Sequence, residues 1–158
     1  MHRKPTVFWD SSAIIATVMS TNHESAGRQL LRLGEAGAID MRVSRDVLRE
    51  CETVIRRKEP SLVAGLALIL DQANFAITLD PDQETVERCI ELTGYRPDAK
   101  ILAAAIETGV DMFATLDTQH FLGNPLLGPS ETSLRVGTAE QCLEWCRSIL
   151  THRQPPED

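Results

Sequence analysis

The chain has 158 residues, enough for one globular domain with its own core, and its 42% hydrophobic and 25% charged residues exclude a disordered protein. The formal net charge of −7 excludes a protein that coats nucleic acid nonspecifically, because such binding depends on Lys and Arg. Asp10 interrupts the apolar N-terminal stretch and Asp71 ends the apolar run 61–70, so we expect no signal peptide, no membrane segment and a cytoplasmic protein.

Hydrophobic spacing along the chain predicts strands that alternate with helices. The first strand covers residues 6–9 and ends at Asp10, and Ser11 or Ser12 is placed to cap the helix that follows, up to residue 19. The remaining predicted helices cover residues 26–35, 47–55, 61–71, 86–92, 99–108 and 138–150, and the remaining strands cover residues 39–43, 75–79, 112–115 and 134–136.

This alternation predicts an α/β fold, a three-layer α/β/α sandwich with a central parallel sheet of about five strands. We expect a single domain over residues 1–150, with a long loop at 116–131, followed by a polar tail at 151–158. Sites in such sheets lie beyond the carboxyl ends of the strands. Asp10 and Asp117, each of which follows a predicted strand, are therefore expected at the same edge.

Four acids near the predicted strand and helix ends have ordinary explanations when taken singly. Asp10 can cap a helix, Asp98 can interact with the dipole of the helix that it begins, and Asp117 can form a turn. Glu50 lies among arginines and can form surface ion pairs. Together, however, acids gathered at one edge would repel one another without a cation, and oxygen ligands suit Mg²⁺. The set favours a divalent metal site.

The same acids fall in four short sequence blocks with a fixed order. The blocks cover residues 7–14 with Asp10, 44–50 with Glu50, 98–105 with Asp98, and 114–121 with Asp117. In order and spacing they resemble the PIN domain family, from about residue 6 to residue 121. The resemblance implies a PIN-like fold and an Mg²⁺- or Mn²⁺-dependent endoribonuclease, in which Asp10, Glu50, Asp98 and Asp117 are the catalytic residues and metal ligands.

Further expectations follow from the same resemblance. Ser12 and Thr115 fall where the family places small polar side chains that support the acids or a bound water. The length of the chain is similar to that of VapC-type toxins, which implies an RNA substrate, a cognate antitoxin protein and a homodimer. A stand-alone RNA-processing nuclease and a catalytically inactive PIN-like binding protein remain open alternatives.

Three other features allow more than one interpretation. Arg45 and Arg49 flank Glu50, and we interpret them as contacts to RNA phosphates, with a solvated helix face as the alternative. His120 stands three residues after Asp117, and we expect it to pack or to stabilise its loop rather than to act as a base or ligand. The four cysteines are interpreted as buried free thiols, because no Cys-x-x-Cys pair is present.

Two other classes also place an acid after the first strand of a parallel sheet. A phosphatase with an aspartyl nucleophile usually has a second acid two residues later, but position 12 of this chain is Ser. A phosphorylatable receiver domain predicts an acidic pair near strand one and a lysine after the last strand, where this chain has Thr138. Both classes fit the sequence less well than a metal-dependent nuclease.

Overall fold

The structure is a computed structural model, and it describes residues 4–127 and 134–152. Its strands are β1 (Thr6–Trp9), β2 (Asp40–Val43), β3 (Ala76–Ile77), β4 (Met112–Ala114) and β5 (Arg135–Gly137). Its α-helices are α1 (Ser11–Met19), α2 (Ala26–Glu35), α3 (Arg45–Lys58), α4 (Val63–Gln72), α5 (Gln83–Thr93), α6 (Arg96–Thr108) and α7 (Ala139–Thr151). Two short 3-10 helices, η1 (Pro60–Leu62) and η2 (Pro125–Leu127), lie in connecting segments.

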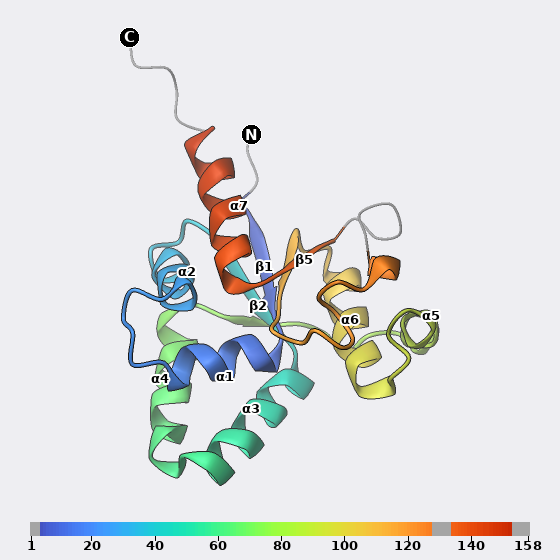
Figure 1. The fold of residues 1–158 in the computed structure, drawn as a ribbon, viewed down its shortest axis with the longest axis horizontal. Coiled ribbons are helices and arrows are strands. Elements are labelled where there is room, and N and C mark those ends of the chain that lie inside the picture. The colour runs from blue at the N-terminus through green and yellow to red at the C-terminus, as the bar shows by residue number, and fades with distance from the viewer. Residues whose placement is uncertain (1–3, 128–133, 153–158) are drawn as a thin grey trace.

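The five strands of the described residues form one parallel sheet in the order β3-β2-β1-β4-β5. Helices α5 and α6 lie on one side of this sheet and α1, α2 and α7 on the other, which confirms the predicted α/β/α sandwich (Figure 1). The order of the strands reverses between β1 and β4. In parallel sheets ligands bind beyond the carboxyl ends of the strands at such a reversal, so the fold itself marks this edge.

The centre of the sheet is apolar on both faces, as expected for a parallel strand covered by helices on each side. All four side chains of β1 are buried. Phe8 pairs in register with Phe113 of β4, and their rings stack with centroids 5.5 Å apart. This packing holds β1 and β4 side by side, so the residues that follow them emerge together.

Several helix starts differ by a few residues from the sequence prediction, and those of α1 and α6 lie beside predicted site residues. The cap of α1 is Asp10, whose backbone carbonyl accepts the first helical N–H groups, and Ser11 and Ser12 lie inside the helix. Helix α6 begins at Arg96 rather than at residue 99, because Pro97 fits the first turn, where its missing N–H has no helical partner. Ser11, Ser12 and Asp98 therefore all lie in the first turn of a helix.

The third strand is shorter than the predicted 75–79 and covers only Ala76–Ile77. It is the edge of the sheet and pairs only with β2. Ile77 is 54% and Leu79 89% exposed, so the apolar pattern of this segment does not correspond to burial. The predicted long loop contains η2, and its residues 128–131 lie outside the described residues, as does most of the tail, 153–158.

The cysteines are buried free thiols, as predicted: Cys51, Cys89, Cys142 and Cys146. Burial raises the thiol pKa of each, to about 12 for Cys51 and Cys142 and to about 11 for the other two. They are therefore protonated and poorly reactive at neutral pH. None of the helices in the described ranges has the length and apolar character needed to span a membrane.

Candidate active site

Four elements bring acids toward the carboxyl edge of β1 and β4. Asp10 directly follows β1, and Asp117 lies three residues after the end of β4. Glu50 projects from α3, and Asp98 lies in the first turn of α6. The charges of the other three acids all raise the pKa of Asp98, so the four carboxylates lie within electrostatic reach of one another.

Asp10 is the most deeply buried of these acids, with 4% of its surface exposed. Its Oδ2 accepts hydrogen bonds from the hydroxyls of Thr115, at 2.8 Å, and Ser12, at 3.0 Å. Burial raises the pKa of the Asp10 carboxyl, and these hydrogen bonds oppose the rise by stabilising the ionised form. The two hydroxyls therefore offset part of the cost of burying this carboxylate.

The hydroxyl of Thr115 connects the two acids that follow the strands. It donates to Asp10 and accepts the backbone N–H of Asp117 at 3.0 Å. Ser12 makes a second connection, because its hydroxyl accepts the backbone N–H of Leu116 at 2.9 Å. The structure thus places both predicted supporting residues, Ser12 and Thr115, in contact with the acids.

Glu50 is held by a residue that the sequence indicated only as a possible helix cap. The Ser11 hydroxyl donates to Oε1 of Glu50 at 2.8 Å, across 39 positions of sequence. Because Asp10 caps α1, Ser11 does not need to, and its buried hydroxyl faces α3. The only sequence signal for this role was that two serines stand in succession where a single residue is enough to cap the helix.

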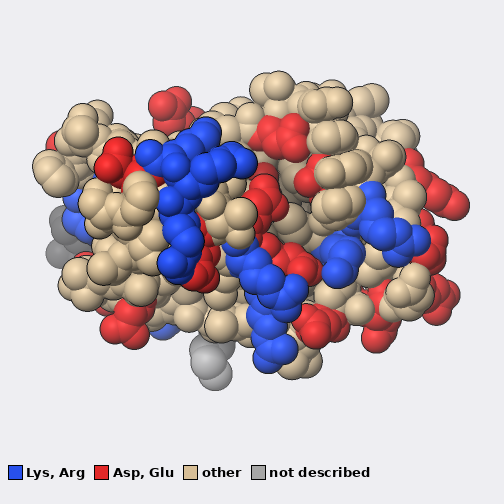
Figure 2. Space-filling model, turned by 90° about the horizontal axis from the view of Figure 1, so that it is seen from below, with Lys and Arg blue, Asp and Glu red and all other residues tan. Residues whose placement is uncertain are grey.

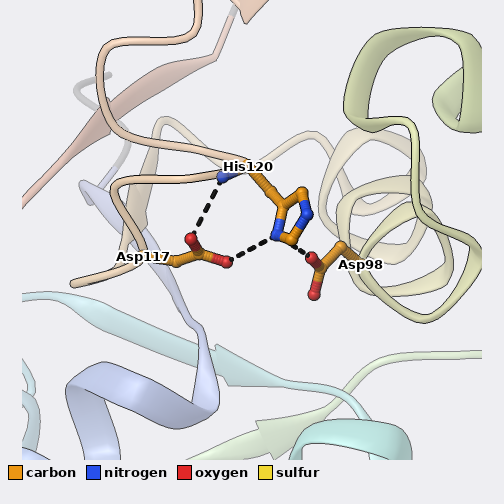
Figure 3. Close-up of side chains that lie close together, drawn as sticks. All are labelled: Asp98, Asp117 and His120. Atoms are coloured by element: carbon orange, nitrogen blue, oxygen red, sulfur yellow. Dashed lines mark hydrogen bonds and ion pairs between the residues drawn. The ribbon is translucent and has the colours of Figure 1, made fainter.

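Asp98 and Asp117 meet at the ring of His120. Nδ1 of His120 lies 2.7 Å from Oδ2 of Asp98 and 3.2 Å from Oδ2 of Asp117 (Figure 3). Asp117 Oδ1 accepts the backbone N–H groups of Gln119 and His120, at 2.8 and 3.0 Å. The sequence predicted a packing or loop role for His120, and the structure places its ring between two of the acids.

The pKa values of the two acids that contact His120 are shifted in opposite directions. Burial raises the pKa of Asp98 to about 6, with nearby carboxylates adding to the rise and His120 opposing it. Burial also acts to raise the pKa of Asp117, but the hydrogen bonds from the His120 and Gln119 backbone outweigh it and lower the pKa. Of these two acids, Asp117 therefore stays ionised to the lower pH.

The donor set fits a divalent cation. Ligand atoms of Asp98, Asp117 and His120 all lie within 4.8 Å of one another, close enough to share one ion. The raised pKa of Asp98 shows that its ionised form lacks sufficient compensation, which a cation would supply. Oxygen-rich sites of this kind suit Mg²⁺ or Mn²⁺. Asp10 and Glu50 are not part of this compact group, but their negative charges raise the pKa of Asp98.

A sequence model of the PIN domain family matches residues 6–119. The chain belongs to the PIN domain family. Its members are generally nucleases. The match includes all four acids and ends one residue before His120. No curated protein sequence matches this PIN domain.

Two solved structures resemble this PIN domain at low sequence identity. PAE2754 from Pyrobaculum aerophilum matches with a TM-score of 0.59 and 15% identity, over 91% of this chain and 96% of that chain. VapC20 of Mycobacterium tuberculosis, described as a toxin that cleaves the sarcin-ricin loop, matches with a TM-score of 0.54 and 16% identity, over 72% and 92% respectively. At these identities the similarity shows the fold alone.

Basic side chains surround the acids of the PIN domain. Figure 2 shows Lys and Arg side chains on several sides of a central group of Asp and Glu. A cavity of about 330 Å³ is lined by Arg49, Arg96 and Lys100 together with Asp46 and Asp80, and by none of the four acids. Asp46 contacts both Arg49, at 3.7 Å, and Lys100, at 3.8 Å. Arg45 is exposed at the first position of α3.

Proposed function

We propose that this PIN domain is an Mg²⁺- or Mn²⁺-dependent endoribonuclease whose catalytic and metal-binding residues are Asp10, Glu50, Asp98 and Asp117. The observation that carries the proposal is the convergence of the four acids from four separate elements, so that three of them raise the pKa of the fourth. Such an arrangement costs free energy unless a cation is bound. Acids with pKa values perturbed in this way are concentrated at functional sites.

The metal ion would supply Lewis-acid chemistry, lowering the pKa of a water and stabilising charge on the leaving oxygen. The protein's own residues prepare the site for it. Thr115 and Ser12 orient the carboxylate of Asp10, and Ser11 orients that of Glu50. Asp117 is held ionised by backbone N–H groups. Three of the four acids, Asp10, Glu50 and Asp117, are thus oriented by the protein before substrate binds, which favours catalysis.

The basic cavity supports RNA as the substrate. Arg49, Arg96 and Lys100 line it, and in sequence they lie within two residues of Glu50 or Asp98. Phosphates of a strand that enters the site would pass these side chains, which compensate locally for the acidic surface elsewhere. Arg49 is therefore retained as an RNA contact, and Arg45, exposed on the same helix, as a weaker one.

Cleavage of a labelled single-stranded RNA by the purified protein tests the proposal. We expect cleavage with Mg²⁺ or Mn²⁺ and none with EDTA, and we expect Asp10→Asn and Asp98→Asn to lower the rate by at least about a hundred-fold with the fold intact. Asp71→Asn, the same change on exposed α4, is the matched control and should cleave normally. Cleavage in EDTA, or by both site variants, would contradict the proposal.

Within this function we propose that the protein is the toxin of a toxin–antitoxin pair, acting on RNA as a homodimer that a cognate antitoxin inhibits. The similarity of its fold to VapC20 supports this form. Induced expression in bacteria should arrest growth, and Asp10→Asn should abolish the arrest. Normal growth with an active purified enzyme would favour a stand-alone RNA-processing nuclease, and a protein that binds RNA without cleaving it would favour a non-catalytic role.

A further inference from the structure

His120 is a metal-ligating residue type that the four-acid site does not use. It lies on the loop after β4, and its Nδ1 is the atom that faces the carboxylates of Asp98 and Asp117 (Figure 3). Among the described residues, the compact group of metal-binding residue types contains His120 together with these two acids. An ion bound through the Oδ2 atoms of Asp98 and Asp117 would therefore lie close to Nδ1.

The distances around Nδ1 match those between neighbouring ligands of one ion. Adjacent ligand atoms on a six-coordinate ion with bonds of about 2.1 Å lie about 3.0 Å apart, by simple octahedral geometry. The observed separations from Nδ1 are 2.7 Å to Asp98 Oδ2 and 3.2 Å to Asp117 Oδ2. A ring N–H donating to the carboxylates gives similar distances, so a proton and a metal ion are alternative occupants of the same position.

The ring is held in this orientation from two sides. Its own backbone N–H donates to Asp117 Oδ1 at 3.0 Å, which fixes the start of the side chain. Tyr95 stacks on the ring with centroids 5.4 Å apart and an interplanar angle of 16°. Because Tyr95 directly precedes α6, which carries Asp98, the stack also ties the His120 loop to that helix. These two contacts limit how far the ring can turn away from the two carboxylates.

We infer that His120 binds the metal ion through Nδ1, beside Asp98 and Asp117, and that this nitrogen makes the site select Mn²⁺ over Mg²⁺. The chemical reason is that Mg²⁺ strongly prefers oxygen ligands and keeps its waters, whereas imidazole binds transition ions well. The inference rests on the proposed metal site, to which it adds a nitrogen ligand and a selectivity among ions. Tyr95 acts as a positioning residue through the ring of His120.

Metal binding by the intact protein tests this without reference to cleavage. Mn²⁺ affinity is measured from the signal of free Mn²⁺ in electron paramagnetic resonance, and Mg²⁺ affinity by calorimetry. His120→Ala should weaken Mn²⁺ binding about 10- to 100-fold and Mg²⁺ binding much less. His120→Asn can present an oxygen near the position of Nδ1, so it should retain Mg²⁺ binding and lose the preference for Mn²⁺. Thermal unfolding in EDTA checks that each variant is folded.

Pulsed paramagnetic resonance of bound Mn²⁺ provides a direct signature. The wild type should show the coupling of a directly bound ¹⁴N nucleus, both His120 variants should lose it, and Tyr95→Phe, which keeps the ring stack, should retain it. An unchanged ratio of Mn²⁺ to Mg²⁺ affinity in both variants, or Mn²⁺ bound without nitrogen coupling, would overturn the inference. If Asp98→Asn binds Mn²⁺ as tightly as the wild type, the proposed metal site itself fails, which separates the two outcomes.

Discussion

Thr115 is fully buried at the end of β4, and its hydroxyl is shared between Asp10 and the backbone of Asp117. A hydroxyl can donate one hydrogen bond and accept others, so a single side chain sets the orientation of one acid and the loop that carries another. An apolar side chain of the same shape would leave the Asp10 carboxylate with one donor fewer and the Asp117 N–H without this acceptor.

Thr115→Val should lower both the cleavage rate and Mn²⁺ affinity by about 10- to 100-fold, the usual effect of removing a hydrogen-bond partner of a metal ligand. Thr115→Ser keeps the hydroxyl and should remain within a few-fold of the wild type. Single-turnover cleavage and Mn²⁺ titration measure the two effects. If the valine variant were as active as the wild type, the hydroxyl would not orient Asp10 as the structure indicates.

The raised pKa of Asp98, about 6, also predicts how the metal-free protein responds to pH. A carboxyl with a higher pKa in the folded than in the unfolded state binds its proton more tightly when folded, so stability falls as pH rises through the folded value. In EDTA the melting temperature should therefore rise as the pH is lowered from about 7.5 to about 5, between the folded and unfolded pKa values of Asp98. Asp98→Asn should flatten this rise, and a parallel curve for the variant would contradict the assignment. The buried Asp10, whose pKa is also raised, contributes in the same direction.

Helix α1, which carries Ser11 and Ser12 in its first turn, packs closely against α2. The close approach depends on Gly27, a buried position of α2: a Cβ added there would overlap the side chain of Thr17 on α1. Thr17 has little freedom to yield, because its hydroxyl donates to the backbone carbonyl of Ala13 at 2.8 Å.

Gly27→Ala should therefore reduce the free energy of unfolding by about 1 to 3 kcal/mol, the usual cost of overpacking a core. Gly65→Ala is the matched control on α4, where an added Cβ meets nothing within 4 Å. Because alanine favours the helix, this second change should stabilise the protein by up to about 1 kcal/mol. Urea unfolding of both variants measures the difference, and equal effects would show that α1 and α2 can separate without cost.

At the scale of the whole molecule, an acidic protein must attract a polyanion to one face only. The formal net charge is −7, yet Lys and Arg gather around the acids on the face seen in Figure 2. Arg96 and Lys100 of α6 and Arg49 of α3 line one cavity, and each lies within two residues of Asp98 or Glu50 in the sequence. The distribution of charge, rather than its total, is what an RNA strand would meet.

Replacing Arg96 and Lys100 together by alanine should raise KM for RNA several-fold with little change in kcat, because these side chains bind substrate rather than the reacting atoms. The dependence of log KM on log salt concentration should become shallower, by about 0.7 for each phosphate of a single strand that the variant no longer neutralises. Arg57→Ala, in the last turn of α3, removes a charge outside this cavity and is the control. An equal effect of the control would indicate a general charge effect.

Much of the architecture was predictable because it depends on neighbouring residues. The apolar runs of β1 and β4, the capping box of Thr138 with Gln141, and the helix ends at Gly94 and Gly109 are local, and the structure has each of them. The length of the two-residue β3 was overestimated, since an apolar pattern does not reveal that a strand lies at the edge of the sheet with its side chains exposed.

The sequence by itself determined the order of strands and helices, the family, and the four acids that the proposed site requires, because these depend on local spacing and residue type. Only the tertiary structure decided which side chains hold these acids in position. Ser11 reaches Glu50 across 39 positions and Thr115 reaches Asp10 across 105, and hydrogen bonds over such separations leave no periodic signal. The same holds for His120, whose contact with Asp98 exists only because the loop after β4 folds against the first turn of α6.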